Sequence, residues 1–381
     1  MEEFAKLLEN IIFSPSRNKK INLLVDYFRR TPNPERGYAL SLLTSNFKFR
    51  YIRNSDLKEI TKSRIDSTLF ELSYDYVGDM AETISLIWPN KTQKKLPSLT
   101  EFVNIIQSSS KESALKFLIR KLDESTQTER WAIIKLFTGG LRIGISEKIV
   151  KISLSKFGDK RLDQIEKIWH GLQMPYLELF EWLENKGPLP EIDVLQTFHP
   201  LMLAHPLNVE NEFKNLVPDD FIAEWKWDGT RVQVIISDTK TIIFSRSGDN
   251  ITNSFPELKF NSKVNVVLDG ELLVGNNLIP QPFNQVQQRL NRKTISKNLL
   301  QRYPAFIRLY DIIILDFRDQ REKTLLERRF KLEEWYRENP NNNLDLSEIL
   351  KFSNWNDLKT KRNKALLEND VYEGIMIKKK K

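Results

Sequence analysis

The sequence predicts a chain of several domains, an all-α N-terminal half followed by an α+β half built around antiparallel sheets. Three observations support this fold class. Apolar residues recur at helical spacing through the first half, whereas runs rich in β-branched and aromatic residues begin only after Pro200. The 381 residues exceed what one hydrophobic core usually organises. Prolines cluster between Pro188 and Pro206, so we place the domain boundary between residues 195 and 196.

The first half is expected to consist of about ten short helices, given usual helix and loop lengths. Its first helix is indicated by Phe4, Leu7, Leu8, Ile11 and Ile12, which follow the i, i+3, i+4 spacing of one buried face. A serine at position 110 can cap a later helix. The other helices are expected at Thr83–Ile87, Ser110–Leu122, Glu129–Phe137, Ser146–Phe157 and Leu162–Leu172.

The second half alternates strands with turn residues, and one clear helix is expected within it. Asp228-Gly229 and the residues 247–250 supply turn chemistry between strands. The helix is expected over Glu322–Asn339. The strands are expected at Phe221–Trp227, Arg231–Ser237, Thr241–Arg246, Val264–Val274, Phe306–Leu315 and Tyr372–Ile377.

Composition excludes several classes of protein. With no cysteine, the chain has no disulfide framework and no thiolate metal site, and three histidines leave little for a histidine-rich site. No apolar run approaches the roughly 20 residues that span a bilayer, and the N-terminus carries no export signal, so we expect a cytoplasmic protein without membrane contact, associated with the nucleoid in a bacterium. The net charge of +8, spread over both halves, is compatible with a nucleic-acid partner but does not establish one.

The segment from Glu224 to Arg231 carries the clearest chemical signal. Lys226 lies near a strand end between Trp225 and Trp227, and an Asp-Gly turn follows. We expect the flanking aromatic groups to remove water from the lysine, which favours the neutral, nucleophilic amine. The alternative is a hairpin lysine that points to solvent.

Further charged and aromatic residues follow, each on or beside an expected strand. Arg246 ends one strand, Glu271 follows a tight turn, Tyr310 precedes an acid, and Glu373 and Lys378 close the series. A nucleoside triphosphate needs an aromatic wall, acids for ribose and Mg²⁺, and cations for phosphates. The sequence supplies all of these without a P-loop or a Rossmann fingerprint.

In this order, the motifs from Glu224 to Lys378 resemble those of the covalent nucleotidyltransferase superfamily, which contains ATP-dependent DNA ligases, RNA ligases and mRNA capping enzymes. The resemblance implies that residues 196–381 form an ATP-grasp-like nucleotidyltransferase (adenylation) domain that uses ATP and Mg²⁺. It implies that Lys226 attacks the α-phosphate of ATP to form a lysine–AMP phosphoramide. It assigns ATP binding to Glu224, Arg231, Arg246, Glu271, Tyr310 and Lys378, and metal binding to Glu271 and Glu373.

The helical half distinguishes between branches of this superfamily. The residues 136–148 join two expected helices, and their glycines let the backbone approach a partner, although an ordinary interhelical turn would look similar. This segment resembles the signature of the N-terminal DNA-binding domain of larger ATP-dependent DNA ligases, and residues 76–83 and 199–206 also resemble segments of those ligases. The resemblance implies DNA contacts by Gly140, Arg142 and Gly144 within residues 1–195. Arg289 and Arg292 resemble a basic DNA-binding stretch, whose alternative is a solvated helix face.

The resemblance therefore implies an ATP-dependent DNA ligase that seals nicks in duplex DNA through lysine–AMP and DNA-adenylate, as a monomer. The C-terminal OB-fold and the last motif of the family would follow Lys378, but the sequence ends at Lys381, so we expect a form without them. The alternatives are a nick-binding or partial ligase fragment without full activity, and an RNA ligase or capping-type nucleotidyltransferase. The sequence does not distinguish DNA repair from replication or recombination.

Overall fold

The computed structural model describes the chain except residues 48–51, 90–92, 139–140, 208–211, 214–215, 239, 291, 293–294 and 369. It divides into two compact units, unit 1 (Met1–Glu191) and unit 2 (Ile192–Lys381). The expected domain boundary after residue 195 falls a few residues beyond this division.

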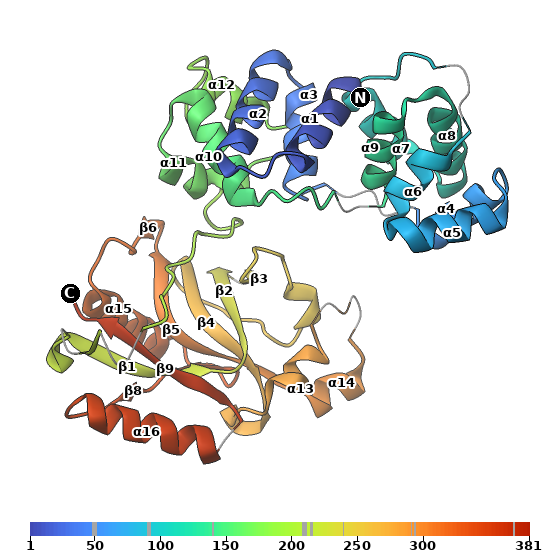
Figure 1. The fold of residues 1–381 in the computed structure, drawn as a ribbon. Coiled ribbons are helices and arrows are strands. Elements are labelled where there is room, and N and C mark those ends of the chain that lie inside the picture. The colour runs from blue at the N-terminus through green and yellow to red at the C-terminus, as the bar shows by residue number, and fades with distance from the viewer. Residues whose placement is uncertain are drawn as a thin grey trace. The chain divides into compact units, whose positions relative to one another are not determined.

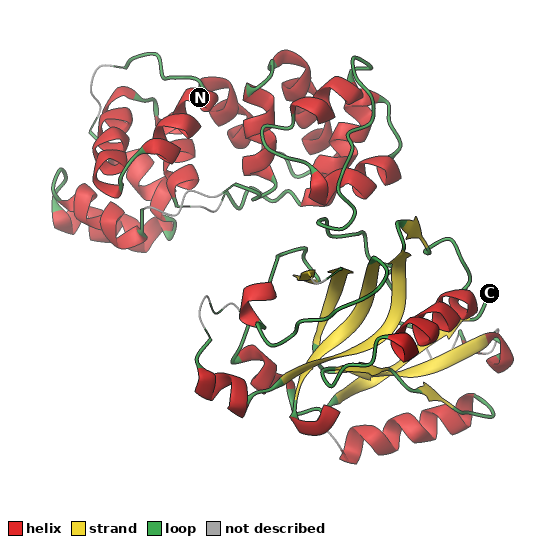
Figure 2. Ribbon diagram, turned by 180° about the vertical axis from the view of Figure 1, so that it is seen from behind, coloured by secondary structure: helices red, strands yellow, loops and turns green. Residues whose placement is uncertain are grey.

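Unit 1 is built from helices, and its described residues contain no strand (Figures 1 and 2). None of the described helices is long and apolar enough to cross a membrane. The helices are α1 (Glu2–Ile12), α2 (Arg17–Arg30), α3 (Glu35–Leu43), α4 (Asn54–Lys62), α5 (Ser67–Val77), α6 (Met80–Ile87), α7 (Leu99–Ser108), α8 (Lys111–Glu124), α9 (Gln127–Phe137), α10 (Glu147–Gly158), α11 (Leu162–Ile168) and α12 (Leu177–Leu183).

Local sequence signals explain where these helices begin and which face they bury. Phe4, Leu8 and Ile11 of α1 are fully buried, as their spacing predicts, and α1 packs against α2 and α9. Ile12, predicted on the same buried face, is exposed. The side chain of Ser110 accepts a hydrogen bond from the Ser113 amide and caps α8. The predictions of an all-helical first half and of the Ser110 cap are confirmed.

Unit 2 contains two sheets and additional helices. Its strands are β1 (Phe221–Trp227), β2 (Thr230–Ser237), β3 (Lys240–Ser245), β4 (Val266–Val274), β5 (Ala305–Leu315), β6 (Arg318–Asp319), β7 (Leu344–Leu346), β8 (Ile349–Leu350) and β9 (Tyr372–Lys379). Its α-helices are α13 (Phe283–Gln287), α14 (Lys297–Arg302), α15 (Leu325–Glu338) and α16 (Trp355–Glu368). Sequence analysis anticipated α15 but not α13, α14 or α16.

The larger sheet has the strand order β3-β2-β4-β5-β6, and β7 adds to β5. The smaller sheet has the order β8-β1-β9. All pairs are antiparallel, as expected, except the parallel pair β5–β7. Helix α15 lies against β5, and α16 lies beside β9 (Figure 1).

Alternation along β2 divides the core of unit 2 between the two faces of the larger sheet. Val232, Val234 and Ile236 pack with Leu332 and Trp335 of α15. The opposite face packs on the segment that enters unit 2, and the residues of this cluster include Phe198, Ile235, Val267 and Ile313. The entering segment therefore covers the same sheet face as the odd-numbered residues of β2.

A buried glutamine fixes the entering segment to the sheet. The His199 amide donates to Gln233 Oε1 (2.9 Å), and Gln233 Nε2 donates to the His199 carbonyl (2.8 Å). Gln233 is fully buried, so no water replaces these bonds if the amide is lost. This pairing holds the chain immediately before Met202, whose carbonyl contacts the site described below.

We expect Gln233→Leu to lower the free energy of unfolding by about 2–4 kcal/mol, because it leaves two buried backbone groups of His199 unpaired. Chemical denaturation of the whole chain would measure this loss. The exposed Gln287→Leu on α13 serves as the control, since it adds the same apolar side chain without removing a buried bond. Equal losses in the two variants would contradict the role of this pairing.

Candidate functional site

The pairing of β1 with β9 gathers several predicted site residues on one strand face. Glu224 and Lys226 lie two residues apart on β1, so their side chains project to the same face. Across the ladder, Ile222 is opposite Lys378 and Lys226 is opposite Gly374, next to Glu373. Lys226 Nζ forms an ion pair with the Glu373 carboxylate, and both side chains are about half exposed, at 47% and 45%.

Trp225 and Trp227 lie on the opposite face of β1, which corrects the expected environment of Lys226. Their rings pack on Tyr372, with centroid distances of 4.5 Å and 4.9 Å. Arg308 also stacks on Trp227, with its guanidinium carbon 4.1 Å from the ring centroid. The prediction that two tryptophans strip water from Lys226 is wrong, because neighbouring residues of a strand point to opposite faces. The immediate partner of Lys226 is instead the acid Glu373.

Glu224 lies deep in the site beside Lys378. Its side chain is only 2% exposed, and its Oε1 is 3.1 Å from Lys378 Nζ. Lys378 Nζ also lies 4.8 Å from the centroid of the Tyr310 ring on β5. The residues predicted to contact the base and the phosphate of ATP are therefore brought together, from two different sheets.

A second group of charges lies on the sheet face that the entering segment covers. Arg231 on β2 donates from Nε and Nη2 to the two carboxylate oxygens of Asp269 on β4, at 3.1 Å and 2.5 Å. Its Nη2 also donates to the Met202 carbonyl at 2.9 Å. Its guanidinium carbon lies 5.9 Å from the Tyr310 ring centroid. Arg231 therefore connects the entering segment, the sheet and the aromatic residue.

Asp269 is a site residue that sequence analysis missed. It is 1% exposed and lies two residues before Glu271, so both carboxylates share one face of β4. The signal was present in Asp269-Gly270-Glu271, since alternation puts both acids on the same side. Burial raises the pKa of Asp269 against the opposing effect of Arg231, and burial with the Asp269 charge raises the pKa of Tyr310 well above its usual value.

Glu271 lies near Asp269 and Arg231, and its pKa is strongly shifted. Burial, together with the nearby Asp269 carboxylate, raises the pKa of Glu271 to about 8. The guanidinium of Arg231 opposes this shift in the pKa of Glu271 without cancelling it. Burial lowers the pKa of Arg231 itself, but the Asp269 carboxylate raises it, and the net shift is upward. A carboxyl group in such a place favours an arriving cation, because positive charge stabilises its ionised form.

The remaining predicted ATP ligand lies at the margin of this group. Arg246 is exposed in the turn that follows β3. The strand order places β3 next to β2, on the side away from β4. Arg246 is thus available to solvent, while the other predicted ligands are concentrated on β1, β2, β4, β5 and β9.

In unit 1, the predicted DNA-contacting turn is partly described. Gly140 lies outside the described residues. Arg142 is exposed with a φ of 45°, and Gly144 is exposed with a φ of 69°. The Gly144 carbonyl accepts a hydrogen bond from Lys20 Nζ at 2.9 Å, and Ser146 caps α10 as predicted. Arg142 is thus an exposed cation four residues before the Ser146 cap of α10, and an arginine together with a helix N-terminus suits a phosphate.

Arg289 does not lie on a solvated surface, which contradicts its predicted contact with DNA. Its side chain is fully buried and forms an ion pair with Glu257. It also donates to the carbonyls of Tyr303 (2.9 Å) and Ser254 (2.8 Å). A buried guanidinium so engaged holds the loop structure together and cannot reach a DNA phosphate. Arg292, by contrast, is exposed.

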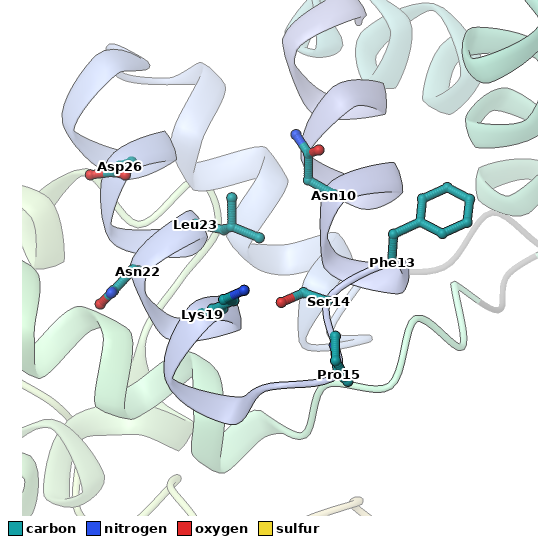
Figure 3. Close-up of a pocket in the computed structure, with 8 residues that line it drawn as sticks. All are labelled: Asn10, Phe13, Ser14, Pro15, Lys19, Asn22, Leu23 and Asp26. Atoms are coloured by element: carbon teal, nitrogen blue, oxygen red, sulfur yellow. The ribbon is translucent and has the colours of Figure 1, made fainter.

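A hollow on unit 1 is distinct from the predicted residues. It has a volume of about 400 Å³ and lies between the end of α1 and the start of α2 (Figure 3). Its lining residues are Asn10, Phe13, Ser14, Pro15, Lys19, Asn22, Leu23 and Asp26. With one lysine, one aspartate and an exposed phenylalanine, the lining favours no single class of ligand.

Two protein-family models match the chain, one within each unit. Residues 1–155 match the family model "DNA ligase N terminus", and residues 201–381 match "ATP dependent DNA ligase domain". A DNA ligase of Nitrosopumilus maritimus is 26% identical over 371 residues, which cover 88% of this chain and 63% of that protein. A probable DNA ligase of Koribacter versatilis is 28% identical over 342 residues, or 82% of this chain and 57% of the relative.

Among solved structures, the one titled "Pmar-Lig_PreS3" covers 99% of this chain and 74% of its own, with a TM-score of 0.55 and 16% identity. This similarity concerns the fold. The chain thus spans somewhat less than two thirds of the length of the first relatives it matches. Sequence and fold comparisons agree on the order of a helical and a sheet-containing region.

The perturbed Glu271 should make stability depend on pH. The native state keeps a proton on Glu271 up to about pH 8, whereas the unfolded chain releases it near 4.5, so this group lowers stability as pH rises between the two values. We expect Glu271→Gln to raise the free energy of unfolding more at pH 9 than at pH 6. Chemical denaturation of both proteins at each pH measures this. The exposed Glu112→Gln should show no such difference, and a pH-independent effect of Glu271→Gln would contradict the raised pKa.

Proposed function

Because this chain belongs to the ATP-dependent DNA ligase family, we propose that it transfers AMP from ATP to Lys226 and then to a nick in duplex DNA, which it seals. One observation carries the proposal. An exposed lysine, Lys226, shares a strand face with the buried acid Glu224 and with Lys378, next to the Tyr310 ring. An amine held near a carboxylate, a second cation and an aromatic ring is suited to attack a nucleotide phosphate.

In the first step, the Lys226 amine forms a bond to the α-phosphorus of ATP as the bond to the β-phosphate oxygen breaks. Pyrophosphate leaves, and the nitrogen loses a proton and becomes a phosphoramide. Glu373 is the acid in contact with Lys226 Nζ, so it orients the amine, and the proton passes to the solvent that reaches this half-exposed pair. This reaction needs positioning and charge neutralisation more than strong acids or bases, which suits a chain without cysteine and with three histidines.

The base and the phosphates are held by the groups around the nucleophile. The Tyr310 ring offers a face on which adenine stacks, and the Glu224 carboxylate accepts a hydrogen bond from the adenine amino group. Lys378 is a flexible cation between Glu224 and Tyr310, and it turns to the α-phosphate. Arg231 and the exposed Arg246 provide further positive charge for the phosphates.

Mg²⁺ fits the acids of this site. Magnesium usually binds through one or two carboxylates and completes its shell with water and substrate phosphates. The described residues contain no group of three or more acids or histidines that could hold a metal ion by themselves. Glu271 and Glu373 would hold the ion. When bound, it neutralises charge on the phosphates.

Two further transfers complete the proposed reaction. An oxygen of the 5′-phosphate at the nick bonds to the AMP phosphorus, and the P–N bond to Lys226 breaks, which restores the amine. The 3′-hydroxyl then attacks the 5′-phosphorus and expels AMP. We propose that unit 1 holds the duplex through phosphates, by Arg142 and the Gly144 turn, with Arg292 of unit 2 as a further contact. That the protein acts as a monomer in the cytoplasm stays a prediction.

The intact mass of the protein after incubation with ATP and Mg²⁺ tests the proposal. We expect a gain of one AMP, and no gain in Lys226→Ala, which lacks the nucleophile. The same incubation with GTP separates a capping-type enzyme, and Lys359→Ala on α16 controls for removal of a lysine from unit 2. Persistent labelling of Lys226→Ala would refute the nucleophile, and absence of labelling in the unaltered chain would indicate a nick-binding protein.

The DNA contact of unit 1 is tested through its salt dependence. Each phosphate contact adds about 0.9 to the slope of log affinity against log salt concentration. We expect Arg142→Ala to reduce that slope by about one for nicked duplexes of any sequence. Lys116→Ala, which removes an exposed cation from α8, is the control. An unchanged slope in Arg142→Ala would place the DNA elsewhere.

A further inference from the structure

Glu224 is held between two cations, only one of which belongs to the site described above. The first is Lys378, 3.1 Å from Glu224 Oε1. The second is Arg329 of α15, whose Nη1 lies 4.0 Å from the same oxygen. Lys378 comes from β9, which is paired to β1, whereas Arg329 comes from a helix packed on the larger sheet.

Arg329 has donor capacity that its other contact does not use. Its Nε donates to Glu333 Oε1 at 2.6 Å, one helical turn further along α15. Its Nη1 is buried and has no hydrogen-bond partner. Glu224 Oε1 is also buried and makes no hydrogen bond, although it is ion-paired with Lys378. A buried guanidinium nitrogen and a buried carboxylate oxygen thus face each other slightly beyond hydrogen-bond distance, a costly state unless the two can close.

The next arginine on the same helix shows what a completed pair looks like. Arg328 donates from Nε and Nη2 to the two oxygens of Asp311, at 2.8 Å and 2.9 Å. Arg328 and Arg329 are equally buried, at 9% and 8% exposure. Arg328 therefore has a finished structural contact, whereas Arg329 directs an unused donor at a residue of the nucleotide site.

In the proposed reaction Lys378 turns from Glu224 toward the α-phosphate, a movement that its flexible four-carbon stem allows. When it turns to the phosphate, Glu224 loses its nearest cation while remaining in the protein interior. A buried carboxylate without a partner is unfavourable, so another cation has to compensate. Arg329 is the one already aimed at Glu224 Oε1.

We propose that Arg329 is the positioning residue for Glu224: it closes on the carboxylate as Lys378 moves to the nucleotide, and keeps Glu224 oriented to read the 6-amino group of the purine. This inference rests on the proposed function of the same site and deepens it, since it names a determinant of base specificity on α15. Arg329 itself touches no nucleotide atom and acts only through Glu224.

The test compares two nucleotides that differ only in the group that Glu224 would read. ATP carries the 6-amino group, and purine riboside triphosphate lacks it. Their equilibrium affinities are measured in the Lys226→Ala protein, where no covalent transfer interferes. We expect Arg329→Met to lower the preference for ATP about tenfold or more, the value of one hydrogen bond to a charged group. Glu224→Gln should do the same, and the double variant should lose nothing further.

Arg328→Met is the matched control, because it removes an equally buried arginine from the same helix. It can lower stability, but it should leave the ratio of the two affinities unchanged, and Arg329→Lys should restore part of the preference. A ratio that Arg329→Met leaves unchanged, or that both variants lower equally, would overturn the inference. Formation of lysine–AMP by the chain with Lys226 intact reports separately on the proposed function, so the two failures are distinguishable.

Discussion

The antiparallel register of β1 and β9 is the constraint on which the site depends. It joins residues about 150 positions apart in the chain, from Phe221 opposite Lys379 to Trp227 opposite Tyr372. Because strand side chains alternate, this register fixes which groups share a face. Glu224, Lys226 and Lys378 meet on one side, and the tryptophans pack on Tyr372 on the other. A shift by one residue would exchange these faces and move the lysine into the aromatic cluster.

The rest of the site is assembled from ion pairs, several of which have to exchange partners if a nucleotide binds. Glu373 is ion-paired with the ammonium of Lys226, and Lys378 is ion-paired with the carboxylate of Glu224. The buried pairs Arg231–Asp269 and Arg328–Asp311 have complete geometry and are suited to remain. The half-exposed Lys226–Glu373 pair contributes little free energy and rearranges readily, whereas the buried Glu224 needs a replacement cation if Lys378 leaves it. The site thus combines a fixed frame with a small set of replaceable contacts.

Sequence reasoning was most successful where a periodic pattern reports directly on structure. The strands that bear Lys226, Glu271 and Tyr310 follow from their β-branched and aromatic residues, and the helix caps at Ser110 and Ser146 follow from capping chemistry. It was weaker where a residue's neighbour is distant in the chain. Arg289 reads as a surface cation but pairs with Glu257, and nothing local reveals that Arg329 faces Glu224. The helix α16 also escaped notice, since its apolar face is narrow and only Leu358 and Ala365 are buried.

The raised pKa of Glu271 links the stability of the fold to the charge that the site carries. Placing Glu271 next to Asp269 in a poorly hydrated site raises its pKa to about 8, so near neutral pH the free protein holds a proton there rather than a second negative charge. That proton limits repulsion within the empty site. An arriving cation would displace it and recover the favourable interaction. The protonated Glu271 adds no negative charge to the unliganded fold and ionises only when positive charge is supplied. Ligand binding and stability are therefore coupled through the carboxyl groups of Asp269 and Glu271.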